Sequence, residues 1–373
     1  MIERLAQLPD GVEISVSGGP SRFYSWRWLR DHGDDPGSLD PSTFQRVVDT
    51  FAMPADLAGT ATLSSDGRAV HVVWCDGAPA TRCSLAVFEG LTDELADTDV
   101  DLWSCGGGVM VRPFTHGDVI ADDATLATWM NELAVQGFAV LEGVPTTEAA
   151  ATELARRIAE PRSTVFGSMW RLESDMTAHR DSAYTTDYLE PHTDATYMTD
   201  APGTQMFCCL ERTGDGGESI LVDGFAIADE IRRSHPEAFD VLTTVAVPGR
   251  YLEPGVHLAA ERPVVRTDQS GRIVQVSLNN YDRAPFWLPE PEMSAFYEAY
   301  GLFQAFVVDR ERWFELRLEP GDALIFDNWR VLHGRRSYSG RRLFYGCYHN
   351  RDDVQSRRRV LRRLSGDAED VSG

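Results

Sequence analysis

The chain has 373 residues and a formal net charge of −23, from 58 acidic and 35 basic residues, and every basic residue other than histidine is arginine. The hydrophobic fraction of 43% is enough for a substantial core, which argues against intrinsic disorder. The acidic balance disfavours nucleic acids and anionic membranes as partners. Because lysine is absent, Schiff-base chemistry such as that of pyridoxal phosphate is excluded.

Cysteine usage and the first residues bear on the cellular location. The six cysteines form no C-x-x-C pair and no spacing typical of a disulfide framework. The starting sequence MIERLAQLPDG lacks the apolar core of a signal peptide. No apolar run reaches the roughly 18 residues that a membrane span needs. We therefore expect a cytoplasmic protein that does not bind membranes.

The first third of the chain predicts short strands and turns. Strands are expected in GVEISVSG (11–18) and RAVHVVWCDG (68–77), and a short helix in STFQRVVDTF (42–51). The segment CGGGVMVRPFTHGD (105–118) then combines three glycines, a proline and a change in composition. We expect a domain boundary there, with a small β-rich domain at 1–105 and a larger domain at 115–373.

The larger domain mixes a few helices with many short strands. Helical spacing of apolar residues predicts helices at 123–137, 147–160, 226–245 and 291–309. Strands are predicted at 138–144, 204–212, 218–225, 263–267, 272–279, 322–328 and 342–350, with DQSG (268–271) as a hairpin turn. Strands and helices do not alternate regularly, so we expect a mainly β fold with flanking helices, such as a jelly roll.

Two short motifs carry candidate metal ligands. His192 and Asp194 lie two residues apart in PHTDATY, and on a strand both would project to the same face. His333 follows an apolar strand in GDALIFDNWRVLHGRRSY (321–338). A lone H-x-D is weak evidence, but two histidines and one carboxylate with open coordination positions form the facial triad of non-haem iron(II) oxygenases.

An arginine lies nine residues after His333, at Arg342 in RRLFYGCY (341–348). A guanidinium binds carboxylates through paired hydrogen bonds, so Arg342 near the iron would hold the distal carboxylate of 2-oxoglutarate. Spacing alone does not choose between Arg342 and Arg341, and a surface salt bridge is the alternative role.

Six motifs together resemble a known family: WRWLRDH (26–32), AYTTDYLEPHTD (183–194), PGTQMFCCLE (202–211), GGESILVDGFAIA (216–228), NWRVLHGRRSY (328–338), and GRRLFYGCY (340–348) followed by SRRRVLRRL. From about residue 20 to about residue 363, the chain resembles the γ-butyrobetaine hydroxylase and trimethyllysine dioxygenase branch of the taurine-dioxygenase-like oxygenases.

This resemblance implies a double-stranded β-helix (jelly roll) catalytic domain behind the small N-terminal domain. It implies iron(II) bound by His192, Asp194 and His333, and 2-oxoglutarate bound by Arg342 and Ser219. In such enzymes O₂ is consumed, 2-oxoglutarate is decarboxylated to succinate, and an unactivated C–H bond of the substrate is hydroxylated.

The resemblance also implies a pocket for a trimethylammonium group, because aromatic faces attract a cation that cannot donate hydrogen bonds. Two departures from the family are visible: Asp181 replaces an asparagine that helps to hold the substrate carboxylate, and Ala195 replaces a tyrosine, which widens the pocket. Asn279 and Asn280 are retained. The expected substrate-binding residues are Phe166, Trp170, Asp181, Tyr184, Asn280, Arg283 and Tyr348.

The N-terminal domain departs further from the family. Where relatives bind structural zinc through three cysteines and a histidine, this chain has Gly33, Asp35, Ser38 and Ala78. We therefore expect no structural zinc. The resemblance leaves a homodimer open.

The expected substrate is a small trimethylammonium zwitterion, with γ-butyrobetaine and 2-trimethylaminoethylphosphonate equally favoured. Arg180 and Arg283 would suit the more highly charged phosphonate. The alternatives are the same oxygenase chemistry on another small amine, amino acid or sulfonate, a non-catalytic jelly-roll binding protein, and a zinc hydrolase with the same ligands.

Overall fold

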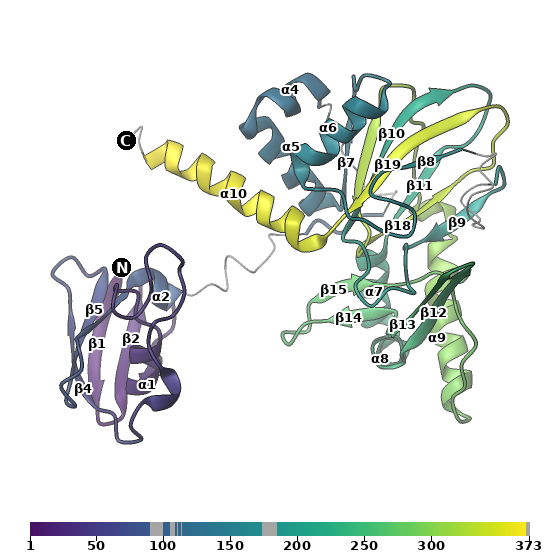
Figure 1. Cartoon of the computed structure of the whole chain (residues 1–373). Helices are drawn as coiled ribbons and strands as arrows, with labels where there is room; N and C mark the ends of the chain where they lie inside the picture. Colours follow the sequence, from purple (N-terminus) through teal and green to yellow (C-terminus); the bar gives the residue numbers. More distant parts are fainter. Residues whose placement is uncertain (90–99, 105–108, 110, 113, 174–184, 371–373) are drawn as a thin grey trace. The chain divides into compact units, whose positions relative to one another are not determined.

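A computed structural model of the chain describes residues 1–89, 100–104, 109, 111–112, 114–173 and 185–370 (Figure 1). The chain divides into two compact units, Met1–Asp97 and Thr98–Gly373. The expected boundary within residues 105–118 stays a prediction, because several of these residues lie outside the described ranges.

The N-terminal unit holds two small antiparallel sheets, and the strands expected in GVEISVSG and RAVHVVWCDG are confirmed. The first sheet has the order β1 (Ile2–Leu8), β2 (Gly11–Val16), β3 (Arg22–Ser25), and the second has the order β4 (Gly59–Leu63), β5 (Ala69–Trp74), β6 (Thr81–Ser84). Short helices α1 (Trp26–Asp31) and α2 (Leu85–Glu89) complete the unit. Val12, Leu29 and Val70 are fully buried in its core.

The helix predicted at 42–51 is wrong. The Asp40 carboxylate accepts hydrogen bonds from the backbone N–H groups of Ser42, at 2.8 Å, and Thr43, at 3.0 Å. This local turn competes with helical hydrogen bonding, and Leu39 instead forms a bridge with Arg46. Only η1 (Thr50–Ala52), a single 3₁₀ turn, is helical there.

Three of the positions at which the family has zinc ligands pack against one another directly. The Asp35 carboxylate accepts from the Ser38 hydroxyl at 2.9 Å and from the Arg82 N–H at 3.0 Å. A Cβ at Gly33 would lie 2.4 Å from Thr81 Cγ2 and 2.6 Å from Ser38 Oγ, so a larger side chain does not fit. Hydrogen bonds link this part of the unit, and the expectation that zinc does not bind here stays a prediction.

The larger unit is built on two facing sheets, which confirms the expected jelly-roll architecture. A five-stranded sheet has the order β7-β17-β10-β19-β8, and a four-stranded sheet has the order β16-β11-β18-β9. Their bounds are β7 (Phe138–Leu141), β8 (Trp170–Leu172), β9 (Leu189–His192), β10 (Thr204–Arg212), β11 (Ser219–Asp223), β16 (Phe314–Leu316), β17 (Ala323–Asp327), β18 (Val331–Arg335) and β19 (Arg342–His349).

Side chains along these strands alternate between an outer and an inner layer. In β10, Met206 and Cys208 pack outward, whereas Phe207 and Cys209 pack inward. In β11, Ile220 packs outward. Because each sheet packs against helices on one face and against the other sheet on the other, its strands consist mostly of apolar residues. Polar residues on the inner face therefore point into the space between the sheets.

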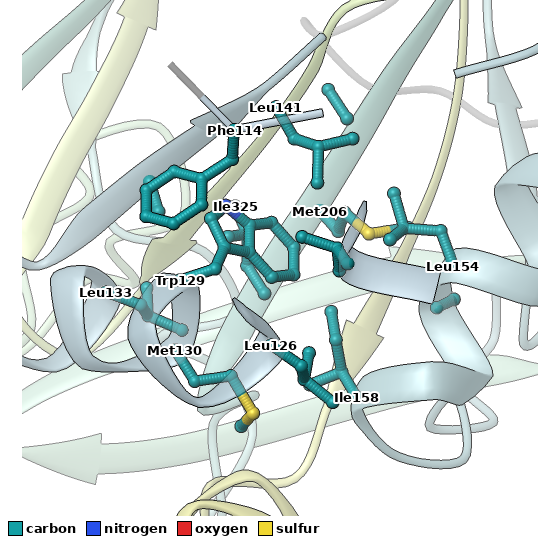
Figure 2. Close-up of a cluster of buried hydrophobic side chains, with 14 of the residues drawn as sticks. Phe114, Leu126, Trp129, Met130, Leu133, Leu141, Leu154, Ile158, Met206 and Ile325 are labelled. Carbon is teal, nitrogen blue, oxygen red and sulfur yellow. The ribbon is translucent and has the colours of Figure 1, made fainter. Parts of the chain in front are cut away.

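Helices cover both outer faces of this sandwich. On the five-stranded sheet lie α4 (His116–Ala121), α5 (Asp123–Gln136), α6 (Glu148–Ile158) and, against α5, α10 (Arg351–Asp370). Figure 2 shows Trp129, Met130 and Leu133 of α5 in the same buried cluster as Met206 and Ile325 of the sheet. No helix in the described ranges is both long enough and apolar enough to cross a membrane.

The four-stranded sheet is covered by α7 (Gly224–Ser234), α8 (Pro236–Thr244) and α9 (Glu292–Val307). The helical segment expected at 226–245 is thus two helices, because Pro236 cannot continue the preceding helix. Two hairpins, β12 (Val247–Glu253) with β13 (Val256–Arg262) and β14 (Val265–Thr267) with β15 (Ile273–Val276), complete the unit. The second hairpin contains the expected DQSG turn.

A buried ion pair joins the end of β11 to the start of β18. The Asp223 and Arg330 side chains are 0% and 2% exposed, and two hydrogen bonds of 2.8 and 3.1 Å connect them. Asp223 also caps α7 by accepting from the N–H of Phe225 and Ala226. Arg330 donates to the Val135 carbonyl at the end of α5. One pair of charges therefore ties helices of both layers to the sheet.

We predict that Asp223→Ala lowers the free energy of unfolding by about 3 kcal/mol or more, because Arg330 keeps a buried charge without a partner. Asp122→Ala is the matched control, since Asp122 caps α5 at an exposed position through Thr125, and its loss costs about 1 kcal/mol. Urea unfolding followed by circular dichroism measures both. Equal losses in the two variants would contradict the assigned role of the buried pair.

Candidate metal centre and cavity

Strand pairing brings two histidines together. In the antiparallel pairing of β9 with β18, His192 lies opposite His333, and their ring centroids are 4.6 Å apart. The backbones approach closely here: a Cβ at Gly334 would lie 2.6 Å from the Leu189 carbonyl oxygen and 2.9 Å from the Pro191 nitrogen. The His333-Gly334 sequence thus combines a ligand with the only residue type that fits beside it.

Asp194 completes the cluster, although not from a strand as expected. β9 ends at His192, and Asp194 lies in the following loop, so the prediction of a shared strand face is wrong. Its carboxylate oxygens lie 3.3 Å from His192 Nε2 and 3.7 Å from His333 Nε2. One candidate ligand atom from each of the three residues lies within 4.8 Å of the others.

Burial and mutual contacts shift the pKa values of all three groups. Burial lowers the pKa of His333 to about 4, which keeps its imidazole neutral. Burial by itself would raise the pKa of Asp194, but His333, His192 and the Tyr348 hydroxyl together hold it well below its ordinary value. For His192, burial lowers the pKa, and contact with the Asp194 carboxylate more than compensates. An ionised carboxylate beside two imidazoles is a donor set for a divalent cation.

Neighbouring groups orient these side chains. His192 Nδ1 lies 2.7 Å from the Glu190 carbonyl oxygen, and donation to this carbonyl leaves Nε2 free to bind a cation. The Tyr348 hydroxyl donates to Asp194 Oδ2 at 2.8 Å. These contacts fix the direction of a ligand atom in the way that metal sites require.

The cluster opens into a cavity between the two sheets. Eight of the predicted site residues line it: Phe166, Trp170, His192, Asp194, Ser219, His333, Arg342 and Tyr348. Ser219, His333 and Arg342 lie on three different strands, and all three face inward. Strand alternation therefore gathers residues that are far apart in the sequence.

The neighbouring residues Arg341 and Arg342 lie in different environments, one at the surface and one in the cavity wall. Arg341 is half exposed and pairs with Glu173 at 2.8 Å and with Glu211 at 3.1 Å. Arg342 is 5% exposed, lines the cavity, and forms no ion pair within the described residues. Burial and the nearby charge of Arg335 lower the pKa of Arg342 to about 9, so its guanidinium stays charged at neutral pH.

The predicted substrate pocket is brought together only in part. Phe166, Trp170 and Tyr348 line the cavity, and the Trp170 and Tyr348 rings are 5.4 Å apart. Asn280 and Arg283 are not among the lining residues, and the Arg283 side chain donates to Asn280 and lies over the Tyr300 ring. Asp181 and Tyr184 lie outside the described residues.

Several lining residues were not singled out from the sequence: Tyr197, Gln205, Tyr281, Asp282 and Arg335. For two of these residues, the sequence pattern could have predicted a place in the cavity. Arg335 lies two residues after His333 on the same strand, so it shares the inner face. Gln205 is a polar residue in an apolar strand that is buried on both faces. Asn279, noted only as the neighbour of Asn280, lines the cavity as well.

A jelly roll whose inner cavity is lined by two histidines and a carboxylate within reach of one ion defines the class of non-haem iron oxygenases. The sequence profile of the taurine catabolism dioxygenase TauD, TfdA family matches residues 110–348, and the chain belongs to this family. It is a dioxygenase of the iron(II)- and 2-oxoglutarate-dependent class, which confirms the expected reaction class, metal and cosubstrate.

Relatives confirm the branch that the motifs indicated. The chain is 34% identical over 369 residues to gamma-butyrobetaine dioxygenase from Pseudomonas sp., covering 96% of this chain and 95% of that protein. It is 32% identical over 368 residues to mitochondrial trimethyllysine dioxygenase from Rattus norvegicus, covering 95% and 86%. A solved taurine dioxygenase from Burkholderia xenovorans aligns with 61% of this chain and 82% of that one, at 16% identity and a TM-score of 0.49.

We predict that Tyr348→Phe weakens binding of cobalt(II), a redox-stable substitute for iron(II), by about tenfold, because the hydrogen bond to Asp194 is lost while the ring stays in place. Tyr345→Phe, on the outer face of the same strand, is the matched control. Calorimetric titration compares both variants with the unaltered chain. An unchanged affinity in Tyr348→Phe would mean that the hydroxyl does not orient Asp194.

Proposed function

We propose that this protein hydroxylates a small trimethylammonium zwitterion, with iron(II) bound by His192, Asp194 and His333. The observation that carries the proposal is the convergence of two imidazole nitrogens and a carboxylate oxygen in the lining of a cavity. Bound iron(II) would supply the activation of O₂. The overall reaction converts substrate R–H, 2-oxoglutarate and O₂ into R–OH, succinate and CO₂.

Arg342 and Ser219 are proposed to hold the distal carboxylate of 2-oxoglutarate. Arg342 brings a buried positive charge to the cavity wall, and no carboxylate of the described residues neutralises it. A buried charge without a partner is costly, so an anionic ligand is the expected compensation. Ser219 lines the same cavity from β11 and offers a hydroxyl donor.

The aromatic lining supports a quaternary ammonium group as the other end of the substrate. Phe166, Trp170 and Tyr348 line the cavity, and the faces of aromatic rings attract cations by about 0.5–2 kcal/mol. Relatives named for γ-butyrobetaine and trimethyllysine both act on trimethylammonium compounds. Asp181, Tyr184, Asn280 and Arg283 stay proposed substrate-binding residues, although Asn280 and Arg283 are not among the residues that line the cavity. The proposed head group is a carboxylate or a phosphonate.

The protein's own part in the reaction is binding, orientation and exclusion of water. The apolar inner layer, including Leu221, Leu324 and Phe326, borders the cavity beside the ligands. Water is thereby kept from the reacting C–H bond, and the Tyr348 hydroxyl holds Asp194 in one orientation.

We predict that Arg342→Met raises the KM for 2-oxoglutarate on the order of 100-fold, because a buried charge pair with the cosubstrate is lost. Arg341→Met is the matched control, since its side chain pairs with surface carboxylates. Succinate formation at varied 2-oxoglutarate concentration measures both. The assignment is wrong if the two variants behave alike.

A substrate panel tests the proposed function itself. γ-Butyrobetaine, Nε-trimethyllysine, 2-trimethylaminoethylphosphonate and taurine are compared by succinate formation and by product mass. At least one trimethylammonium compound is expected to stimulate turnover, and its neutral analogue, with carbon in place of the quaternary nitrogen, to show at least about tenfold lower kcat/KM. No stimulation by any quaternary amine would refute the substrate class. A missing visible absorption band with iron(II) and 2-oxoglutarate under anaerobic conditions would favour a binding protein.

Two finer expectations complete the proposal: a cytoplasmic location and an N-terminal domain without structural zinc. The resemblance leaves a homodimer open. The strongly negative charge, −23 overall, supports the absence of nucleic acid and membrane partners. Light scattering and metal analysis of the purified chain test the dimer and the zinc content.

A further inference from the structure

The loop that carries Asp194 is held in an unfavourable backbone conformation. β9 ends at His192, and Ala195 has a φ of 59°, in the left-handed region that non-glycine residues rarely adopt. Such a conformation costs about 1 kcal/mol or more and persists only where surrounding contacts enforce it. Contacts that enforce the conformation of Ala195 also determine where the Asp194 carboxylate points.

The contacts on the Asp194 backbone include those of a buried amide, Asn328, which is 1% exposed. Its Oδ1 accepts from the Asp194 N–H at 2.8 Å, and its Nδ2 donates to the Asp194 carbonyl at 3.2 Å. The same Nδ2 donates to the Pro202 carbonyl at 3.1 Å, and the Asn328 N–H donates to the Gly203 carbonyl at 2.9 Å. Asn328 thus forms hydrogen bonds with both ends of the loop from Asp194 to Gly203.

Asn328 also belongs to the hairpin that carries the second histidine. It lies in the turn between β17 and β18, five residues before His333. One side chain therefore links the Asp194 loop to the turn that leads into the His333 strand. We infer that Asn328 is a positioning residue that sets the metal affinity of the centre by fixing the Asp194 backbone. This inference rests on the proposed iron site.

The chemistry at this position requires an amide. Asparagine offers an acceptor and a donor at once, which matches the N–H and the carbonyl of Asp194. An aspartate keeps the acceptor, but it would place a carboxylate against the carbonyls of Asp194 and Pro202. Aspartate is close to asparagine in size, so Asn328→Asp changes hydrogen bonding with little change in packing.

The test measures cobalt(II) affinity by calorimetry on the full-length protein, with thermal unfolding recorded for each variant. Asn328→Asp and Asn328→Ala are expected to weaken binding at least about tenfold, in the range typical of residues that orient metal ligands. Trp329→Phe is the matched control: it removes one hydrogen bond to the same loop, from Trp329 Nε1 to the Ala201 carbonyl, but does not touch Asp194. Its affinity is expected to stay within twofold of the unaltered chain.

A second-site variant gives an independent readout. Glycine adopts a φ of 59° without penalty, so Ala195→Gly added to Asn328→Ala is expected to restore part of the lost affinity. Unchanged cobalt(II) binding in both Asn328 variants, or an equal loss in Trp329→Phe, overturns the inference. If the unaltered chain itself binds no cobalt(II), the proposed iron site fails, and the inference fails with it.

Discussion

The antiparallel pairing of β9 with β18 is the constraint on which the centre depends. Because His192 and His333 are cross-strand partners, their separation is fixed by sheet geometry, and Gly334 allows the close approach. The third candidate ligand, Asp194, is not held by strand pairing. Asp194 follows the strand end, and its position depends on hydrogen bonds to Asn328 and Tyr348. The proposed centre therefore combines two candidate ligands on a rigid strand pair with one that depends on hydrogen bonds from neighbouring side chains.

Burial of both sheet faces explains how a cavity with a positive wall exists in a chain of net charge −23. Apolar residues fill the inner layer at the β7 and β17 end, and the polar inner residues Ser219, His333 and Arg342 collect where that packing stops. Arg342 thus brings its charge to the cavity, whereas Arg341, one residue away, forms ion pairs with Glu173 and Glu211 at the surface.

Periodicity in the sequence predicted most elements of the larger unit, because strands buried on both faces and amphipathic helices leave clear patterns. The failures arose where a side chain decides the local structure. Asp40 forms a turn in place of the helix expected at 42–51. The spacing of His192 and Asp194 suggested a shared strand face, although the strand ends between them. Asn328 was predicted only as the last residue of the strand at 322–328, and its role was missed because its partners lie 126 and 134 positions away in the sequence.

Tyr348 shows how closely the substrate pocket and the metal centre are joined. Its ring packs beside Trp170 in the proposed aromatic pocket, while its hydroxyl donates to Asp194 and accepts from Gln205 at 3.4 Å. The side chain is 8% exposed and held at both ends, so ring and hydroxyl cannot move independently. A cation against the ring face therefore lies one side chain away from a metal ligand. The ring that lines the proposed pocket and the carboxylate of the metal cluster are thus joined through one side chain.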